Sequence, residues 1–182
     1  MRRGGWPRVL LAGNRIALHL RAMKKVATHL TRLADHTRTI LNGESIQQYG
    51  ALCFRKGAEG GLEVLLITTR DTGRWTIPKG WSIKGLAPHE IAEREAWEEA
   101  GVKGRAKKRV FGHFAYIKSL EDGVKKPAFV EVYLLDVRNT KKRFPECEER
   151  KLAWMSPMEA ASLVNEPELK SLLRRMETHV LP

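Results

Sequence analysis

The stretch GWSIKGLAPHEIAEREAWEEAGV, from Gly80 to Val102, is typical of a loop followed by a helix with a defined start and end. Pro88 suits the first helical turn, where its missing N–H would have no partner in any case. Gly101 suits the position just after a helix, where the backbone turns left-handed. The stretch therefore predicts a helix from Pro88 to Ala100.

The predicted helix carries three acids, Glu95, Glu98 and Glu99. At about 100° per residue, spacings of three and four residues place all three carboxylates on one side of the helix. Because like charges repel, a cation is expected among them, and a hard divalent ion with oxygen ligands is the natural candidate. Arg94 lies one turn before Glu98 and is expected to hold a carboxylate in place. A solvated acidic face with salt bridges is the alternative interpretation.

These residues resemble the Nudix box, which reads G-x5-E-x7-R-E-U-x-E-E-x-G-U with U an apolar residue. Gly80 and the segment Arg94–Val102 stand at the spacing of that motif. Leu86 departs from it, because it stands where the motif has its first glutamate. The Arg-Glu-x-x-Glu-Glu core is intact, and the resemblance covers about Gln48 to Met176.

The resemblance implies a hydrolase that cleaves a pyrophosphate bond with Mg²⁺ or Mn²⁺. Glu95, Glu98 and Glu99 would bind the metal, with Arg94 beside them, and one acid of the site would deprotonate the attacking water. A further metal ligand is expected from the loop Phe144–Arg150, which holds three acids: Glu146, Glu148 and Glu149. A metal on carboxylates polarises phosphate oxygens and lowers the pKa of a bound water.

Four cations flank the box in the sequence: Arg70, Arg74, Lys79 and Lys84. Cations are needed to hold a polyanion, and arginine can do so through two parallel hydrogen bonds. Of these four, Lys79 and Arg70 are the residues that we most expect to bind the substrate, with Lys79 at the mouth of the site beside Gly80. The expected partner is a small anionic phosphate compound.

Within the family, the chain is most similar to the diphosphoinositol polyphosphate and diadenosine polyphosphate hydrolases. The similarity lies in Ile67–Arg70 and Trp75–Pro78 before the box, in Glu98–Gly104 at its end, and in Glu149–Lys151 followed by Trp154. Lys79-Gly80-Trp81 departs from the run of glycines in those enzymes. The similarity implies a diadenosine polyphosphate or an inositol pyrophosphate as substrate, in preference to ADP-ribose.

The pattern along the chain predicts an α/β fold. Expected strands are Gly50–Phe54, Leu62–Thr69, Trp75–Ile77, Arg109–Ile117, Ala128–Val137 and Ala153–Met155. Helices are expected after the capping-box sequence that starts at Ser156 and from Pro167 to Glu177. The elements predict an α/β/α sandwich, in which a mixed sheet carries the box helix on one face and the last helices on the other. The resemblance to the Nudix family implies the same architecture.

Residues 1–42 differ from the rest of the chain, since they supply +8 of the net charge of +12. Apolar residues at helical spacing predict an amphipathic helix there: Ile16, Leu20, Met23, Ala27, Leu30 and Ala34. We expect a basic N-terminal extension, partly disordered, before a Nudix domain at residues 43–182. The helix has four open interpretations: docking on its own domain, homo-oligomer formation, a membrane surface, or an organelle presequence. A separate interpretation is that Met23 is the true first residue of the protein.

The composition is that of a globular protein, because 42% of the residues are hydrophobic and 30% are charged. Cys53 and Cys147 show no metal-binding spacing, and reduced thiols in the cytoplasm are expected. No apolar run approaches the roughly 20 residues that span a bilayer. The basic segment lacks interleaved aromatic residues, so nucleic acid is not expected as its partner.

Two classes of function compete. The first is the metal-dependent pyrophosphohydrolase, and the second is a binding or regulatory module on a Nudix fold, for which Leu86 is the hint in the sequence. A hydrolase of ADP-ribose or nucleotide sugars is a further alternative. The intact acids and Arg94 favour the enzyme.

Overall fold

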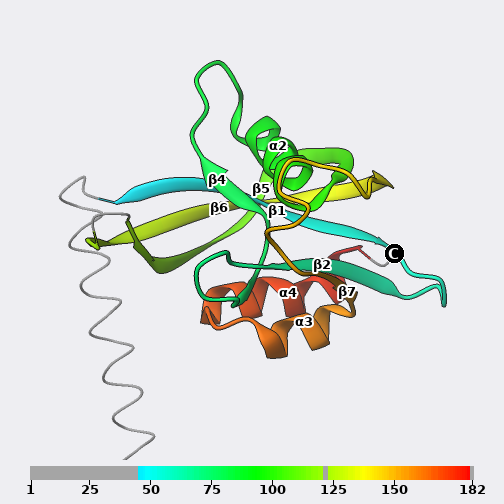
Figure 1. Cartoon of the computed structure of the whole chain (residues 1–182). Coiled ribbons are helices and arrows are strands. Elements are labelled where there is room, and N and C mark those ends of the chain that lie inside the picture. Colours follow the sequence, from blue (N-terminus) through cyan, green and yellow to red (C-terminus); the bar gives the residue numbers. More distant parts are fainter. Residues whose placement is uncertain (1–44, 121–122, 181–182) are drawn as a thin grey trace, which may run out of the picture. The chain divides into compact units, whose positions relative to one another are not determined.

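The structure, a computed structural model, describes residues 45–120 and 123–180. Those residues hold a sheet with helices on both of its faces (Figure 1). The predictions for residues 1–42, namely the basic amphipathic helix and the division of the chain at residue 42, lie outside the described part and stay predictions.

One mixed sheet of seven strands lies at the centre of the described residues. Its strands are β1 (Ile46–Lys56), β2 (Leu62–Thr68), β3 (Trp75–Thr76), β4 (Lys79–Trp81), β5 (Val102–Ser119), β6 (Lys125–Thr140) and β7 (Leu152–Met155). The main order is β3-β2-β1-β6-β5, with β4 paired to β1 and β7 to β2. The β1–β6 pair is parallel and the other pairs are antiparallel, so the predicted mixed sheet is confirmed.

Three helices cover the sheet in the described part of the chain: α2 (Pro88–Ala100), α3 (Pro157–Leu163) and α4 (Pro167–Val180). Figure 1 shows α2 on one face and α3 with α4 on the other. Pro88 begins α2 and Gly101 ends it with φ 65°, as predicted. Ser156 caps α3 through a reciprocal capping box with Glu159. None of the described helices has the length and apolarity that a bilayer span needs.

The core has two layers because successive strand residues point to opposite faces of the sheet. On β1, Ala51 and Cys53 pack toward α2, whereas Leu52 and Phe54 pack toward α3 and α4. The α2 layer contains small helix residues, Ala92, Ala96 and Ala100, all buried. Their size lets α2 lie close to the sheet, and this closeness brings its acids near β4.

The sheet differs from the prediction most at two places, besides strand ends that lie a few residues farther out. β4 was not predicted, and β5 begins at Val102 and not at Arg109. The start of β5 lies at the edge of the sheet and exposes Lys103, Arg105 and the run Lys107–Arg109. Most of its side chains meet water, so the alternation of apolar and polar residues that marks a half-buried strand is weak.

Candidate active site

A pocket of about 350 Å³ lies where β4, α2, the end of β5 and the loop before β7 meet. Seven of the residues singled out in the sequence line it: Arg70, Arg74, Lys79, Gly80, Glu95, Glu98 and Glu99. Glu146 lines it as well, from the loop expected to supply a further acid. The helix and the loop are held together by a backbone hydrogen bond of 3.1 Å from Glu146 N to Glu98 O.

Glu95 lies directly against the backbone of Gly80. A Cβ atom at residue 80 would lie 2.0 Å from Glu95 Oε1 and 2.1 Å from its carboxyl carbon, so only glycine leaves room for this carboxylate. Burial and the charges of Glu99, Glu98 and Glu146 raise the pKa of Glu95 to about 7. The carboxylates of the pocket therefore act on one another.

Glu99 is the buried carboxylate of the group. It accepts a hydrogen bond of 2.9 Å from the backbone N–H of Lys79 and a salt bridge from Arg150. Burial raises the pKa of Glu99, against the lowering effect of Lys79 and Arg150. Glu98 is more exposed, and its Oε1 pairs with Arg94 Nε at 2.8 Å, as the spacing of one helical turn predicted.

Arg150 lines the pocket but was not predicted as a site residue from the sequence. Its side chain is only 6% exposed. Besides its pair with Glu99, it donates to Glu146 Oε2 at 2.8 Å and to the carbonyl oxygen of Thr68 at 3.1 Å. The guanidinium thus ties the end of β2 and the loop before β7 to the box helix. The stretch Glu149–Lys151 was noticed in the sequence, but nothing in it distinguishes Arg150 from a surface cation.

The donor set suits a hard divalent cation. Glu95, Glu98, Glu99 and Glu146 supply carboxylate oxygens in one pocket, and burial together with the charges of the other three acids raises the pKa of Glu95. In the described ranges, no three acid, histidine or cysteine side chains already stand together as a metal-binding group. A metal held here would have to draw these carboxylates closer together.

Lys79 lies deeper than the mouth of the site, where it was expected. It is half-buried, and its Nζ lies 5.3 Å from the centre of the Tyr116 ring. Burial lowers the pKa of Lys79, and the charge of Glu99 offsets part of that effect. The hydroxyl of Tyr116 donates to Oε1 of the buried Gln48 at 2.7 Å. Neither Tyr116 nor Gln48 was singled out from the sequence, where each lies in an ordinary strand pattern.

The remaining predicted residues separate into two groups. Arg70 and Arg74 line the pocket and each is ion-paired, Arg70 with Glu149 at 3.1 Å and Arg74 with Glu166 at 3.4 Å. Lys84 is exposed on the loop before α2, and neither it nor Glu148 or Glu149 lines the pocket.

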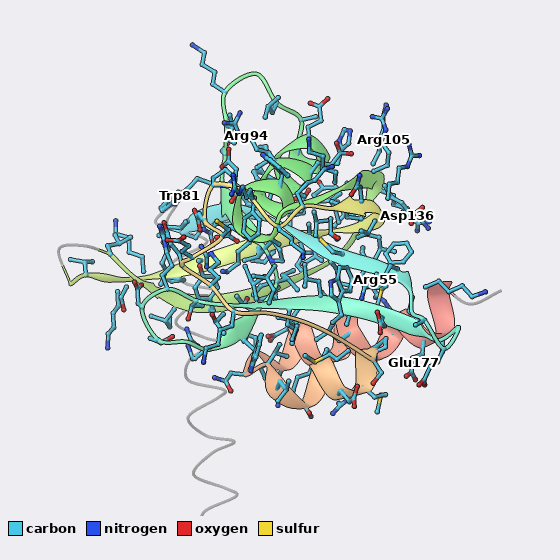
Figure 2. The ribbon with its side chains drawn as sticks, turned by 45° about the vertical axis from the view of Figure 1, so that its right-hand side comes forward. Arg55, Trp81, Arg94, Arg105, Asp136 and Glu177 are labelled. Atoms are coloured by element: carbon cyan, nitrogen blue, oxygen red, sulfur yellow. The ribbon has the colours of Figure 1, made fainter. Side chains whose placement is uncertain are left out.

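The rim of the pocket includes an aromatic side chain. Trp81 is 49% exposed, and Lys118 Nζ lies 5.5 Å from its ring centre. Figure 2 shows Trp81 and Arg94 on the same side of the molecule, away from Arg105 and Asp136.

Part of the chain is similar to curated relatives. Diphosphoinositol polyphosphate phosphohydrolase 3-beta of Bos taurus is 38% identical over 81 residues, which are 44% of this chain and 48% of the relative. The 3-alpha protein of Homo sapiens is 39% identical over 72 residues, 39% of this chain and 43% of the relative. The chain thus matches less than half the length of each of these relatives.

Solved structures share the fold. A binary complex of the C. elegans Ap4A hydrolase aligns with a TM-score of 0.59 at 24% identity, over 74% of this chain and 97% of the other. A NUDIX hydrolase from Nitrosomonas europaea aligns with a TM-score of 0.54 at 15% identity, over 75% and 89%.

The family is established by a sequence profile that spans most of the chain. The profile of the NUDIX domain matches residues 47–176, a range that begins in β1, ends in α4 and contains all the pocket residues named above. The chain therefore belongs to the Nudix family.

Proposed function

We propose that this protein is a divalent-metal-dependent pyrophosphohydrolase that acts on a substrate with a long or crowded phosphate chain. The observation that carries the proposal is the meeting of four carboxylates with cations in one pocket. The carboxylates suit a Mg²⁺ or Mn²⁺ ion, and the cations suit the phosphate groups that such an ion bridges.

The acids of the pocket have separate tasks in this proposal. Glu95, Glu98 and Glu99 would hold the metal, with Glu146 as the further acid from the loop. A bound metal would polarise the phosphate and lower the pKa of the attacking water. Arg94 fixes the carboxylate of Glu98, and Arg150 fixes those of Glu99 and Glu146. One carboxylate of the group accepts the proton of the attacking water, since a carboxylate beside a bound metal can act as a general base.

The cations bind and orient the phosphate chain. The ammonium group of Lys79 lies inside the pocket, and the guanidinium groups of Arg70 and Arg74 lie on its wall. Each guanidinium has five N–H donors, so one ion pair does not exhaust it. Three cations around a metal site exceed the need of a diphosphate and favour a longer chain. The names of the diphosphoinositol relatives support the same substrate class.

The test is a comparison of substrates at one ionic strength and one metal concentration. We expect a higher kcat/KM for a diadenosine polyphosphate or an inositol pyrophosphate than for ADP-ribose. Chelation of the metal with EDTA should abolish all turnover. A clear preference for ADP-ribose would refute the substrate class and leave the metal site standing. Full turnover in EDTA would refute the mechanism.

A further inference from the structure

A second cluster of charge lies outside the pocket, at the edge of the sheet. We define the basic strip as nine Lys or Arg residues on the first half of β5, the end of β6 and the turn after it: Lys103, Arg105, Lys107, Lys108, Arg109, Arg138, Lys141, Lys142 and Arg143. All nine are exposed, and none lines the pocket.

Strand pairing places the segments that carry the strip side by side, so its cations border one edge of the sheet on both of its faces. Lys103 pairs with Asn139, and Arg105 pairs with Asp136. The backbone N–H of Lys141 donates to the carbonyl of Gly101 at 2.8 Å, which holds the turn after β6 against the start of β5. A register shift between Ala106 and Val110 puts three residues of β5, at 107–109, against a single residue of β6. This bulge carries the run Lys-Lys-Arg.

The part of the strip around Arg105 lies away from Trp81 on the rim of the pocket. The register aligns Trp81 with Gln48, and Gln48 with Val130 of β6. Asp136, beside Arg105, is six residues farther along β6, which at 3.3 Å per residue is roughly 20 Å. Figure 2 agrees, since Arg105 and Asp136 lie on the opposite side of the view from Trp81.

The strip is not neutralised within the protein. Among the described residues, none of the nine cationic side chains forms an ion pair. The side chain of Lys103 lies over an aromatic ring, with its Nζ 4.4 Å from the ring centre of Trp97. Two acids border it, the exposed Asp136 and Glu93, which accepts a hydrogen bond from Ala106 N.

Charge counting shows how uneven the distribution is. Residues 45–182 contain 24 Lys or Arg and 19 Asp or Glu. Without the strip the same residues contain 15 cations against the 19 acids, so the domain would be negative. Its excess of positive charge therefore comes from the strip at one edge of the sheet, and such an excess attracts anions over a distance.

Protection of the sheet edge explains only part of the strip. Lysines and bulges on an edge strand prevent it from pairing with another molecule, and five of the nine residues lie on the edge strand β5. Arg138 lies on the inner strand β6, and Lys141–Arg143 follow it in a turn. Protection of the edge strand therefore does not explain these four residues.

We propose that the basic strip binds the phosphodiester backbone of a single-stranded nucleic acid. The cations from Lys103 to Arg109 follow one strand for roughly 20 Å, which spans several phosphates of one backbone. The half-buried Trp97 adds an aromatic side chain at the Lys103 end. Exposed large apolar side chains, which a membrane surface would take up, lie at other positions: Trp81, Leu86, Ile117, Val124, Leu152, Met158 and Leu163. The inference stands independently of the proposed hydrolase activity.

The test uses the full chain and a fluorescein-labelled single-stranded RNA of about 20 nucleotides, a length that exceeds a single binding site. The strip variant replaces Lys107, Lys108 and Arg109 by serine. The control variant replaces Lys56, Lys125 and Arg174, three exposed cations outside the strip and the pocket, by serine. The two variants have the same net charge, and equal thermal unfolding midpoints would show that both are folded.

We expect the strip variant to raise the Kd for RNA by on the order of tenfold at moderate salt, because three phosphate contacts are lost. The slope of log K against log salt should become shallower by about 2. The control variant should bind like the wild type. Equal weakening of both variants would overturn the proposal, as would unchanged binding by the strip variant. Strip-dependent binding to phosphatidylserine vesicles without strip-dependent RNA binding would assign the surface to a membrane and overturn it as well.

Discussion

The arginines of the pocket and the cations of the basic strip use positive charge in opposite ways. In the pocket, Arg70, Arg74 and Arg150 are each paired with a glutamate. In the strip, Arg105 and Arg138, like the other seven cations, have no acidic partner among the described residues. An ion pair holds a cationic side chain in one position and neutralises its charge. This suits a site whose groups must be precisely placed. Unpaired charge on an exposed strand suits a surface that needs long-range attraction.

If activity depends on the precise placement of the carboxylates in the pocket, displacing Glu95 should have the largest effect on kcat/KM. Gly80→Ala would place a Cβ 2.0 Å from Glu95 Oε1, so the carboxylate must move. We expect kcat/KM to fall by on the order of 10², since a misplacement of about 1 Å can have that effect. Gly61→Ala is the control, because a Cβ there meets nothing within 4 Å. Steady-state kinetics of both variants measures the difference, and equal activity would show that the fit at Gly80 is unimportant.

The second prediction compares a buried ion pair with an exposed one. Arg150→Met leaves Glu99 with a buried, unpaired charge and should lower the free energy of unfolding by about 3 kcal/mol. Arg70→Met removes a pair whose side chains are 58% and 46% exposed, and should lower it by less than about 1 kcal/mol. Urea denaturation at neutral pH with EDTA measures both. Similar losses would contradict the distinction between buried and exposed pairs.

The third prediction separates a cation inside the pocket from cations outside it. Lys79→Ala should raise KM by about tenfold and leave kcat within a few fold, if Lys79 binds ground state and transition state alike. Lys84→Ala removes an exposed cation that does not line the pocket, and should change KM less than about twofold. Initial rates at low and high salt measure both effects. A larger increase in KM for Lys84→Ala than for Lys79→Ala would show that the substrate binds at the loop before α2.

The smallest effect concerns stability against pH in the absence of metal. The pKa of Glu95 is about 7 in the folded protein and 4.5 as its ordinary value. Between these values the folded state retains a proton that the unfolded state has released, so stability falls as pH rises through this window. Glu95→Gln removes that dependence. Relative to wild type, the variant should gain on the order of 1 kcal/mol between about pH 5 and about pH 8. Parallel pH profiles of the two proteins would refute the raised pKa.

Much of the fold could be predicted because its signals are local. Pro88 and Gly101 mark the ends of α2, and the capping box marks the start of α3, since each feature depends on a few neighbouring residues. β4 and the first half of β5 were missed because one is very short and the other is exposed at an edge. Local patterns carry little information about strands of these kinds.

The site could be predicted in part. The acids of the box and the cations Arg70, Arg74 and Lys79 line one pocket, as their nearness in the sequence suggested. Arg150 and Tyr116 reach the pocket from distant segments, and their roles depend on pairings across 51 residues to Glu99 and 68 residues to Gln48. Such contacts follow from tertiary structure and leave no mark on the neighbouring sequence. For the same reason Lys84, near the box in sequence, does not line the pocket.

The central claim is that the carboxylates of the pocket form a metal-dependent hydrolytic site. The most direct test measures kcat for a diadenosine polyphosphate against Mg²⁺ concentration, for the wild type and for Glu98→Gln. Glu59→Gln, an exposed change in the β1–β2 turn, serves as the control. We predict that Glu98→Gln lowers kcat by on the order of 10² or more, because it removes charge from the metal-binding group. Wild-type turnover that is independent of Mg²⁺, or unchanged in Glu98→Gln, would contradict the claim.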